Sequence, residues 1–362
     1  MSEILEALGG YEFFSPIDTV EKINGGNVNV SYKITSADGE KYVLQKINRA
    51  VFPDVDALME NVLRVTEKLS AFKAEKTLDK MRVLNIKFTR EGRSFLKNAN
   101  GCYRVYDYVK NSASSVLRGA RASYGAGNAF GNFITIMNTE PLPQLNCVLK
   151  DYHNAPARLA RLAESYKKAP FSRKNKAKEV AEYLFSKERT VRKFHSSAGS
   201  FPKRIIHNDT KINNVIFDAA SGEAVGVFDL DTVSYGLISD DFGDGTRSIA
   251  GPEKEDENDL EAACINAENY FAFADGFLSG VSRYITDGER EILPRATLVI
   301  TLELAARFLT DYLEGDAYFR TEYPEQNLAR AKCQAALAKD VEKRLPDIKK
   351  RLKSHVNYEI YG

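Results

Sequence analysis

The sequence predicts an α+β fold in two lobes, a small antiparallel β-rich lobe followed by a mostly helical lobe. At 362 residues, the chain is longer than the size at which one hydrophobic core keeps growing. Its first hundred or so residues are dominated by strand and turn patterns, whereas apolar residues recur at helical spacing from about residue 114 onward. We place the boundary so that residues 1–109 form the first lobe and residues 110–362 the second.

Strand and hairpin signals dominate the first lobe. Residues 20–48 read as three strands joined by a Gly-Gly-Asn turn and an Asp-Gly hairpin. Residues 54–72 place apolar side chains at helical spacing and predict one helix. Residues 81–89, 94–98 and 101–109 supply further strands. These patterns predict a small antiparallel sheet that carries a helix.

The second lobe is expected to be helical over residues 114–200 and 258–353, with a β-rich island at 204–232 between them.

The formal net charge of +1 gives no electrostatic case for binding nucleic acid or an anionic membrane surface. The sequence has no apolar run of membrane-spanning length and no secretory leader pattern, so we expect a cytoplasmic protein without a membrane partner. Its four cysteines lie far apart, which argues against a zinc cluster or a disulfide framework.

The β-rich island contains the stretch "IIHNDTKINNVIFD", followed by "VFDLD". Asp209 lies in a loop after one apolar strand, and Asn214 begins the next strand. Asp229 follows after a hairpin that can bring it beside Asn214. A carboxylate and a carboxamide oxygen suit Mg²⁺ when phosphates complete its shell. Asp209 can then take the proton of an attacking hydroxyl, as transfer of a phosphoryl group requires. The alternative is a pair of polar turns that cap a hairpin, and His207 is interpreted as a brace for the loop.

The stretch "INGGNVNVSYKI" is a candidate for a loop that covers phosphates. Gly25 and Gly26 allow the backbone to approach a polyphosphate closely, and Asn27 and Asn29 offer side-chain donors. Taken alone, the same residues also fit an ordinary hairpin turn.

Together these stretches resemble the aminoglycoside phosphotransferase/choline kinase superfamily, which has a protein-kinase-like fold. Within it, the chain is most similar to the N-acetylhexosamine 1-kinases. The resemblance is carried by "YVLQKIN", "LMENVLRVTE", "HNDTKINNVIFD", "FDLDTVSYG", "DFGDGTRS" and "RFLTDYLEGDAYFRTEYPEQNLARAKCQ". It runs from about residue 20 to residue 335, and the last two stretches point to the hexosamine branch.

The resemblance implies roles for individual residues. Asp209 becomes the catalytic base, Asn214 and Asp229 become Mg²⁺ ligands, and Glu60 falls where such kinases place the glutamate of their lobe-bridging helix. The adenine of ATP is expected at a hinge made by Tyr106, Asp107, Tyr108 and Val109. Candidates for binding the acceptor are Asp241, Asp244, Arg247, Arg307 and Tyr318.

Several of these residues also have structural interpretations. Glu60 can be a solvated helix residue, and Asp241 can cap a helix. Arg307 can be held by a buried acceptor such as Asp311, and Tyr318 can be a core aromatic residue.

One position departs from the superfamily pattern, which has a Lys or Arg on the third strand to hold the nucleotide phosphates. Here that strand offers Gln45 and Lys46, and neighbouring strand residues point to opposite faces of a sheet. Only one of the two can therefore face the phosphates, and the sequence leaves both alignments open.

The resemblance implies an enzyme that uses ATP and Mg²⁺ to phosphorylate the anomeric hydroxyl of an N-acetylhexosamine. Its partners would then be ATP and a small polar acceptor, an amino sugar. Two alternatives remain: the same chemistry on an aminoglycoside, choline or homoserine, or a pseudokinase that only senses nucleotide or sugar. The sequence does not distinguish a monomer from a homodimer.

Overall fold

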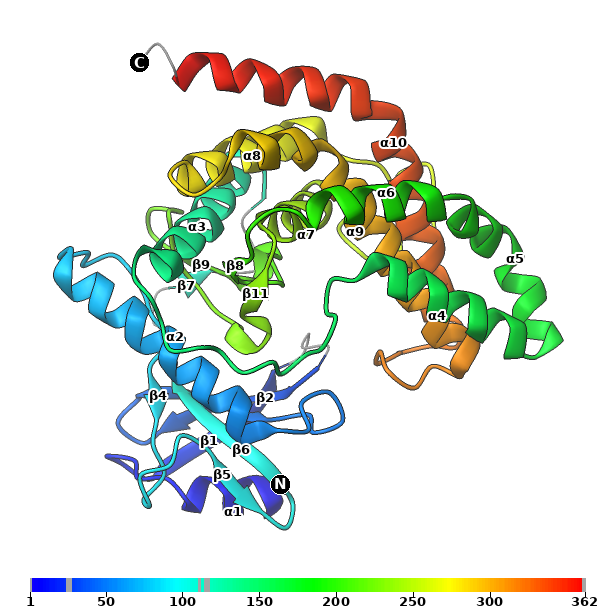
Figure 1. The fold of residues 1–362 in the computed structure, drawn as a ribbon. Coiled ribbons are helices and arrows are strands. Elements are labelled where there is room, and N and C mark those ends of the chain that lie inside the picture. Colours follow the sequence, from blue (N-terminus) through cyan, green and yellow to red (C-terminus); the bar gives the residue numbers. More distant parts are fainter. Residues whose placement is uncertain (1, 24–27, 110–111, 114–117, 360–362) are drawn as a thin grey trace.

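The computed structural model describes residues 2–23, 28–109, 112–113 and 118–359. The first lobe is an antiparallel sheet in the order β1-β2-β3-β6-β4, with β5 also paired to β6 (Figure 1). Its elements are α1 (Ser2–Gly9), β1 (Ile17–Ile23), β2 (Val30–Ser36), β3 (Lys41–Lys46), α2 (Val55–Glu75), β4 (Ile86–Lys87), β5 (Leu96–Asn98) and β6 (Gly101–Asp107).

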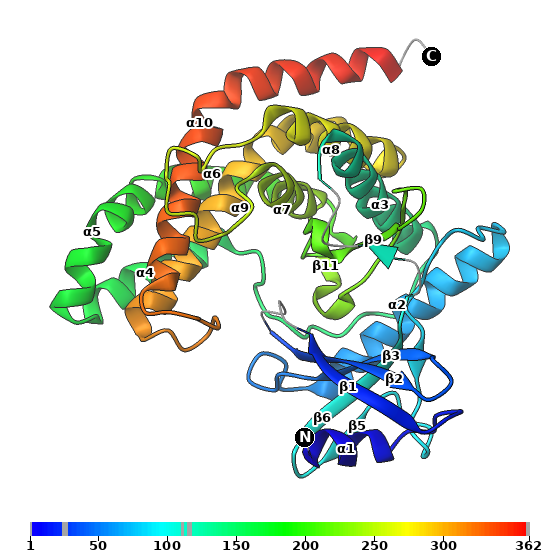
Figure 2. The same ribbon diagram turned by 180° about the vertical axis from the view of Figure 1, so that it is seen from behind.

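The two faces of this sheet pack on different helices. Leu44 and Val105 face α1, whereas Cys102 and Tyr106 belong to the larger core that includes α2. Figure 2 shows α1 beneath the sheet, on the side away from the second lobe. Because side chains alternate between the faces of a strand, this packing determines which residues of β3 and β6 point toward the second lobe.

The second lobe is mostly helical, as Figures 1 and 2 show. Its helices are α3 (Ala120–Thr139), α4 (Ala155–Lys168), α5 (Phe171–Ser186), α6 (Glu188–Ala198), α7 (Ile238–Ala250), α8 (Ala267–Val281), α9 (Asp287–Glu314) and α10 (Gln326–Glu359). Its short strands are β7 (Ser112–Ala113), β8 (Arg204–Ile206), β9 (Val215–Asp218), β10 (Ala224–Val227) and β11 (Ser234–Gly236). They form a β10-β9-β7 sheet and a β11-β8 pair.

Helix α3 is held close to α8 by glycines on both helices. A Cβ atom on Gly127 would lie 2.1 Å from the carbonyl oxygen of Phe273, and one on Gly276 would lie 2.1 Å from that of Tyr124. The helices therefore approach to a distance that only glycine permits at these positions. This contact anchors the helix that supports the loop after β8.

The expected fold class is confirmed: the protein has an antiparallel β-rich lobe followed by a helical lobe. Three regions differ from expectation. Residues 2–9 form α1, which the sequence analysis did not predict, and within residues 81–89 only Ile86–Lys87 is a strand. The helix expected from residue 258 begins only at Ala267. The lobe boundary at residues 109/110 stays a prediction. Within the described part of the chain, no helix is long and apolar enough to cross a membrane.

Candidate active site

A cavity of about 620 Å³ lies between the two lobes and is lined by residues of both. Most residues singled out in the sequence analysis line it: Asn29, Gln45, Tyr106, Asp107, Tyr108, Val109, Asp209, Asn214, Asp229, Asp244, Arg247, Arg307 and Tyr318. Lys46, Glu60 and Asp241 are not among its lining residues. Gly25, Gly26 and Asn27 lie outside the described residues.

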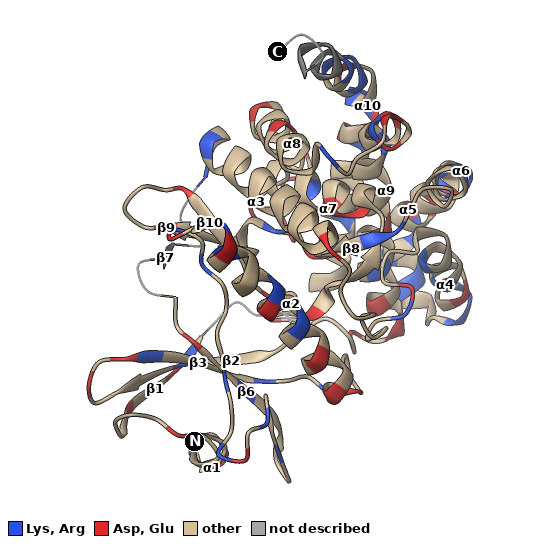
Figure 3. Ribbon diagram, turned by 60° about the vertical axis from the view of Figure 1, so that its left-hand side comes forward, with Lys and Arg blue, Asp and Glu red and all other residues tan. Residues whose placement is uncertain are grey.

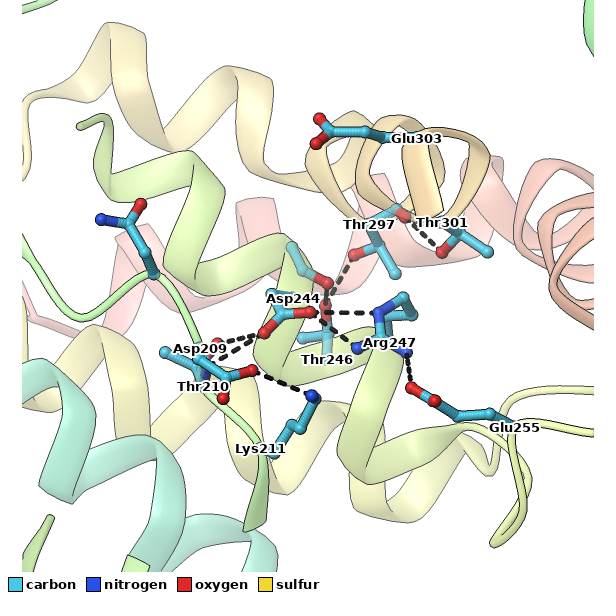
Figure 4. Close-up of polar contacts among 12 residues, drawn as sticks. Asp209, Thr210, Lys211, Asp244, Thr246, Arg247, Glu255, Thr297, Thr301 and Glu303 are labelled. Atoms are coloured by element: carbon cyan, nitrogen blue, oxygen red, sulfur yellow. Dashed lines mark hydrogen bonds and ion pairs between the residues drawn. The ribbon is translucent and has the colours of Figure 1, made fainter. Parts of the chain in front are cut away.

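The loop between β8 and β9 presents Asp209 to this cavity. Asn214 donates from Nδ2 to the Asp209 carboxylate over 2.8 Å and to the Asp209 carbonyl oxygen over 2.9 Å. The Lys211 ammonium lies 3.1 Å from the other carboxylate oxygen (Figure 4). The Asp209 carboxylate raises the pKa of Lys211, so this side chain stays charged. Two neighbours on the same loop thus orient the candidate base.

Helix α7 holds the loop from behind. The two oxygens of Asp241 accept hydrogen bonds from the backbone N–H groups of His207 (2.8 Å) and Asn208 (2.7 Å). Asp241 is fully buried. The structure therefore corrects the expectation that Asp241 contacts the acceptor: its oxygens are occupied and it positions the loop.

Asp244, one turn further along α7, lines the cavity and also contacts the loop. It accepts from the backbone N–H of Thr210 over 2.9 Å and forms a 2.7 Å ion pair with Arg247 (Figure 4). Burial alone would raise the pKa of Asp244, but Arg247 and Lys211 outweigh it and hold that pKa at about 2. Arg247 also lies 3.8 Å from Glu255.

His207 braces the loop, as the sequence analysis predicted. Its imidazole packs edge-on against Phe130 and Phe133 of α3, and Nε2 lies 3.0 Å from the carbonyl oxygen of Phe228. Burial lowers the pKa of His207, which keeps the ring neutral in its apolar surroundings.

Asn214 and Asp229 fit a divalent cation. Asn214 donates the N–H groups of its carboxamide to Asp209. The carboxamide oxygen of Asn214 is therefore available, and this is the atom with which an asparagine binds a metal. Burial and the carboxylates of Asp231 and Asp209 raise the pKa of Asp229 to about 7. A site whose carboxylates repel one another in this way is stabilised by a bound cation. Asp229 also has a left-handed backbone (φ 60°), a conformation that Asp and Asn tolerate better than most residues.

The sheet of the first lobe contributes one cation to the cavity lining, and it comes from β6 rather than β3. Arg104 forms two contacts with Asp231, Nη1–Oδ1 at 2.6 Å and Nη2–Oδ2 at 2.8 Å, and both side chains are almost fully buried. Its Nε and Nη2 also donate to Oε1 of Gln45 over 3.0 and 2.8 Å. Burial would lower the pKa of Arg104, but Asp231 more than offsets this and the net direction is upward. The ion pair between Arg104 and Asp231 joins β6 of the first lobe to the segment between β10 and β11 of the second lobe.

The same geometry decides between Gln45 and Lys46. Gln45 faces the cavity beside Arg104, its neighbour across the β3–β6 pairing. Lys46 points to the opposite face, where it pairs with Glu3 of α1 at 3.2 Å and lies over the ring of Tyr103. Of the two residues, only Gln45 therefore faces the cavity, and Lys46 points away from it.

Glu60 does not reach the cavity either. It lies on the exposed face of α2, where both charge signs alternate (Figure 3), and contacts Arg64 at 3.4 Å and the side chain of Asn146 at 3.0 Å. Its carboxylate is more than half exposed. The expectation that Glu60 contacts the nucleotide site is thus corrected in favour of its interpretation as a solvated helix residue.

Of the four residues proposed to approach the phosphates (Gly25, Gly26, Asn27 and Asn29), Asn29 is the one that the structure describes. It donates from Nδ2 to Asp231 over 2.8 Å and accepts from the backbone N–H of Asn48 over 3.0 Å. The residue before β2 is therefore tied to the same acidic side chain as Arg104.

The part of the cavity that lies within the second lobe is formed mainly by α7, α9 and the segments around residues 149–153 and 316–319; we refer to it as the candidate acceptor half. Arg307 lies over the rings of Tyr152 and Phe319, with its guanidinium carbon 5.3 and 5.5 Å from their centroids. Asp311 does not pair with Arg307, contrary to the structural interpretation above. It accepts from the backbone N–H groups of Ala317, Tyr318 and Phe319 and thereby shapes the segment that lines the cavity.

Several ionisable cavity residues escaped the sequence analysis as functional candidates, among them Arg104, His153, Lys211, Asp231 and Glu303. Signals for four of these were present. Arg104 is a lone charge between apolar strand residues, and Glu303 is a lone charge in an apolar stretch of helix. Lys211 follows Asp209 by two residues, and Asp231 follows Asp229 by two residues. His153 had no local signal of its own.

Replacing Asp241 with alanine should lower the free energy of unfolding by about 2–4 kcal/mol, because two buried N–H groups lose their acceptor. Turnover should fall as well, since the loop carrying Asp209 loses its support, while the KM for ATP changes little. Denaturant unfolding and steady-state kinetics test this. Asp240→Ala is the matched control, because it removes a neighbouring carboxylate that caps only Leu237. Equal effects of the two variants would contradict the role assigned to Asp241.

The fold and the site together define a kinase-like enzyme that transfers a phosphoryl group to a small molecule. A family model described as the phosphotransferase enzyme family matches residues 19–276, so the chain belongs to that family.

Solved structures with the same fold cover nearly the whole chain. The microcompartment-associated aminopropanol kinase has a TM-score of 0.63 at 15% identity, over 97% of this chain and 99% of that chain. An aminoglycoside phosphotransferase from Alicyclobacillus acidocaldarius has a TM-score of 0.61 at 12% identity, over 97% and 96%. Spectinomycin phosphotransferase, in complex with ADP and spectinomycin, has a TM-score of 0.61 at 12% identity, over 95% and 98%. Each is a relative in fold.

Proposed function

We propose that the protein transfers the γ-phosphoryl group of ATP to the anomeric hydroxyl of an N-acetylhexosamine. The acceptor hydroxyl gives its proton to Asp209 as its oxygen bonds to the γ-phosphorus. The bond from that phosphorus to the bridging oxygen breaks, and ADP leaves. Lys211, beside Asp209, supplies positive charge to the group in transfer.

Asn214 and Asp229 would hold the divalent metal, which neutralises phosphate charge when bound. The apolar liners Ile23, Val43 and Ile216 suit adenine, next to the proposed hinge of Tyr106–Val109. Arg104 and Gln45 would face the phosphate side of the nucleotide.

The observation that carries the choice of acceptor is the balance of charge in the acceptor half of the cavity. Asp209 pairs with Lys211, Asp244 with Arg247, and Glu303 lies opposite His153. Glu255, from the acidic stretch 253–259, lies near Arg247 rather than joining an acidic cluster. A polycationic or quaternary ammonium acceptor would meet no net negative charge here, whereas a neutral sugar needs this mixture of donors and acceptors. The rings of Tyr152, Phe319 and Tyr318 add apolar surface for a sugar face.

A panel of acceptors tests this proposal. ATP consumption should rise most with N-acetylglucosamine or N-acetylgalactosamine, and far less with free hexoses, aminoglycosides, choline, ethanolamine or homoserine. Phosphorus NMR of the product should then place the phosphate on the anomeric oxygen. Preferential turnover of a cationic alcohol, or phosphate on another hydroxyl, would overturn the assignment.

A further inference from the structure

Glu303 is a buried carboxylate whose hydrogen-bonding capacity is unused. It lies on α9, is 2% exposed and lines the cavity. Neither of its oxygens has a hydrogen-bond partner among the described residues. Figure 4 shows Glu303 on α9, near Thr301 and Thr297 of the same helix. An ionised carboxylate buried without donors is costly. Donors are therefore expected from a molecule that enters the cavity.

The group opposite Glu303 balances its charge without supplying those hydrogen bonds. Nδ1 of His153 lies 3.6 Å from Oε1 of Glu303, which is too long for a hydrogen bond. Glu303 outweighs the effect of burial and raises the pKa of His153 to about 9, so the imidazole is charged near neutral pH. Arg307 adds further positive potential to this region. The carboxylate is electrically compensated, but its lone pairs remain free.

The pair of His153 and Glu303 lies next to the loop that carries Asp209. The other ring nitrogen of His153, Nε2, lies 3.3 Å from the carbonyl oxygen of Asn208, the residue before Asp209. The pair therefore links α9 to the catalytic loop. A molecule that donates to Glu303 is brought close to the candidate base.

We propose that Glu303 is the specificity-determining acceptor of hydrogen bonds from two adjacent donor groups on the ring of a neutral substrate, either two hydroxyls or one hydroxyl and an amide N–H. This inference rests on the proposed function and deepens it. A neutral ring is favoured over an ammonium group because His153 and Arg307 already offset the charge of Glu303. Charge-assisted hydrogen bonds of this kind are worth about 1.5–3 kcal/mol, or roughly 10- to 100-fold in affinity.

The test compares Glu303→Gln with the wild type on N-acetylglucosamine and on analogues that each lack one ring hydroxyl. The variant should lower kcat/KM about 10- to 100-fold, mainly through the KM of the sugar. An analogue that lacks a hydroxyl bound by Glu303 should lose activity with the wild type and little more with the variant. The loss should fall on the sugar: the KM of the sugar should rise far more than the KM of ATP, a split that a merely structural role would not predict. Glu314→Gln is the matched control, because it removes a carboxylate from the same helix at an outer position, paired with Arg161.

Several outcomes would overturn the inference: sugar kinetics within twofold of the wild type, an equal rise in the KM of ATP and of the sugar, or wild-type preference for an acceptor with an ammonium group. The analogues probe the wild-type protein, so the inference can be tested even if Glu303→Gln folds poorly. If no N-acetylhexosamine is phosphorylated, the proposed function fails by itself. The role of Glu303 is then decided in the same way on whichever neutral sugar is turned over.

Discussion

Replacing Asp209 with asparagine is expected to lower kcat by about 10²- to 10⁴-fold, because the acceptor hydroxyl loses the group that takes its proton. The KM for ATP should change little, since the proposed metal ligands and the nucleotide side of the cavity are intact. An asparagine keeps one oxygen that can accept from Asn214, so the loop should hold its shape. Steady-state kinetics and isothermal titration with ADP measure the two effects separately.

Asp218→Asn is the control for Asp209→Asn. Asp218 ends β9 and accepts from Ser221 in a turn, and it is not among the cavity residues. Its replacement should leave kcat within a few-fold of the wild type. An Asp209→Asn enzyme that kept more than a tenth of wild-type turnover would contradict the assignment of the base.

Replacing Arg104 with methionine is expected to lower the free energy of unfolding by about 3–5 kcal/mol. The variant leaves Asp231 buried with no cation in contact, and breaking one side of a buried ion pair is far more costly than replacing both sides. Adding Asp231→Leu to Arg104→Met should therefore recover much of the lost stability. Affinity for ADP should remain low in both variants, because the nucleotide side of the cavity has lost its cation. Chemical denaturation and titration with ADP report these effects.

The surface pair of Arg118 and Glu253 is the control for Arg104. Their side chains are about half and three-quarters exposed, and they lie 3.2 Å apart. Arg118→Met should cost no more than about 1 kcal/mol, as is usual for solvent-exposed ion pairs. If Arg104→Met were equally mild, the buried pair would not join the lobes.

The loop that carries Asp209 could be predicted because its geometry is local. His207, Asp209 and Asn214 lie within eight consecutive positions, and a two-strand hairpin brings Asp229 beside them. Apolar residues on either side predict the strands that position the loop. The fold class followed from the same kind of signal, the change from strand patterns to helical spacing along the chain.

Residues that act through distant partners could not be assigned in this way. Gln45 and Lys46 have the same local pattern, and their roles depend on which face of β3 is turned to α1. Arg104 and Asp231 are 127 positions apart. Their buried ion pair therefore appears only when the two lobes are in place. At Glu60 the sequence pattern and the structure disagree. Its position along the chain fits the glutamate expected on the lobe-bridging helix, but its side chain is exposed to solvent.

The sequence by itself determined the α+β class, the strand and turn that carry Asp209, Asn214 and Asp229, and the loop-bracing role of His207. These features depend on hydrogen bonds and alternation over short stretches of chain. The tertiary structure alone decided that Gln45 faces the cavity with Arg104 beside it, that Asp241 supports the loop, and that Glu303 lines the cavity without a hydrogen-bond partner among the described residues. The physical reason is that burial and charge compensation depend on packing between segments, and no local pattern specifies which segments meet.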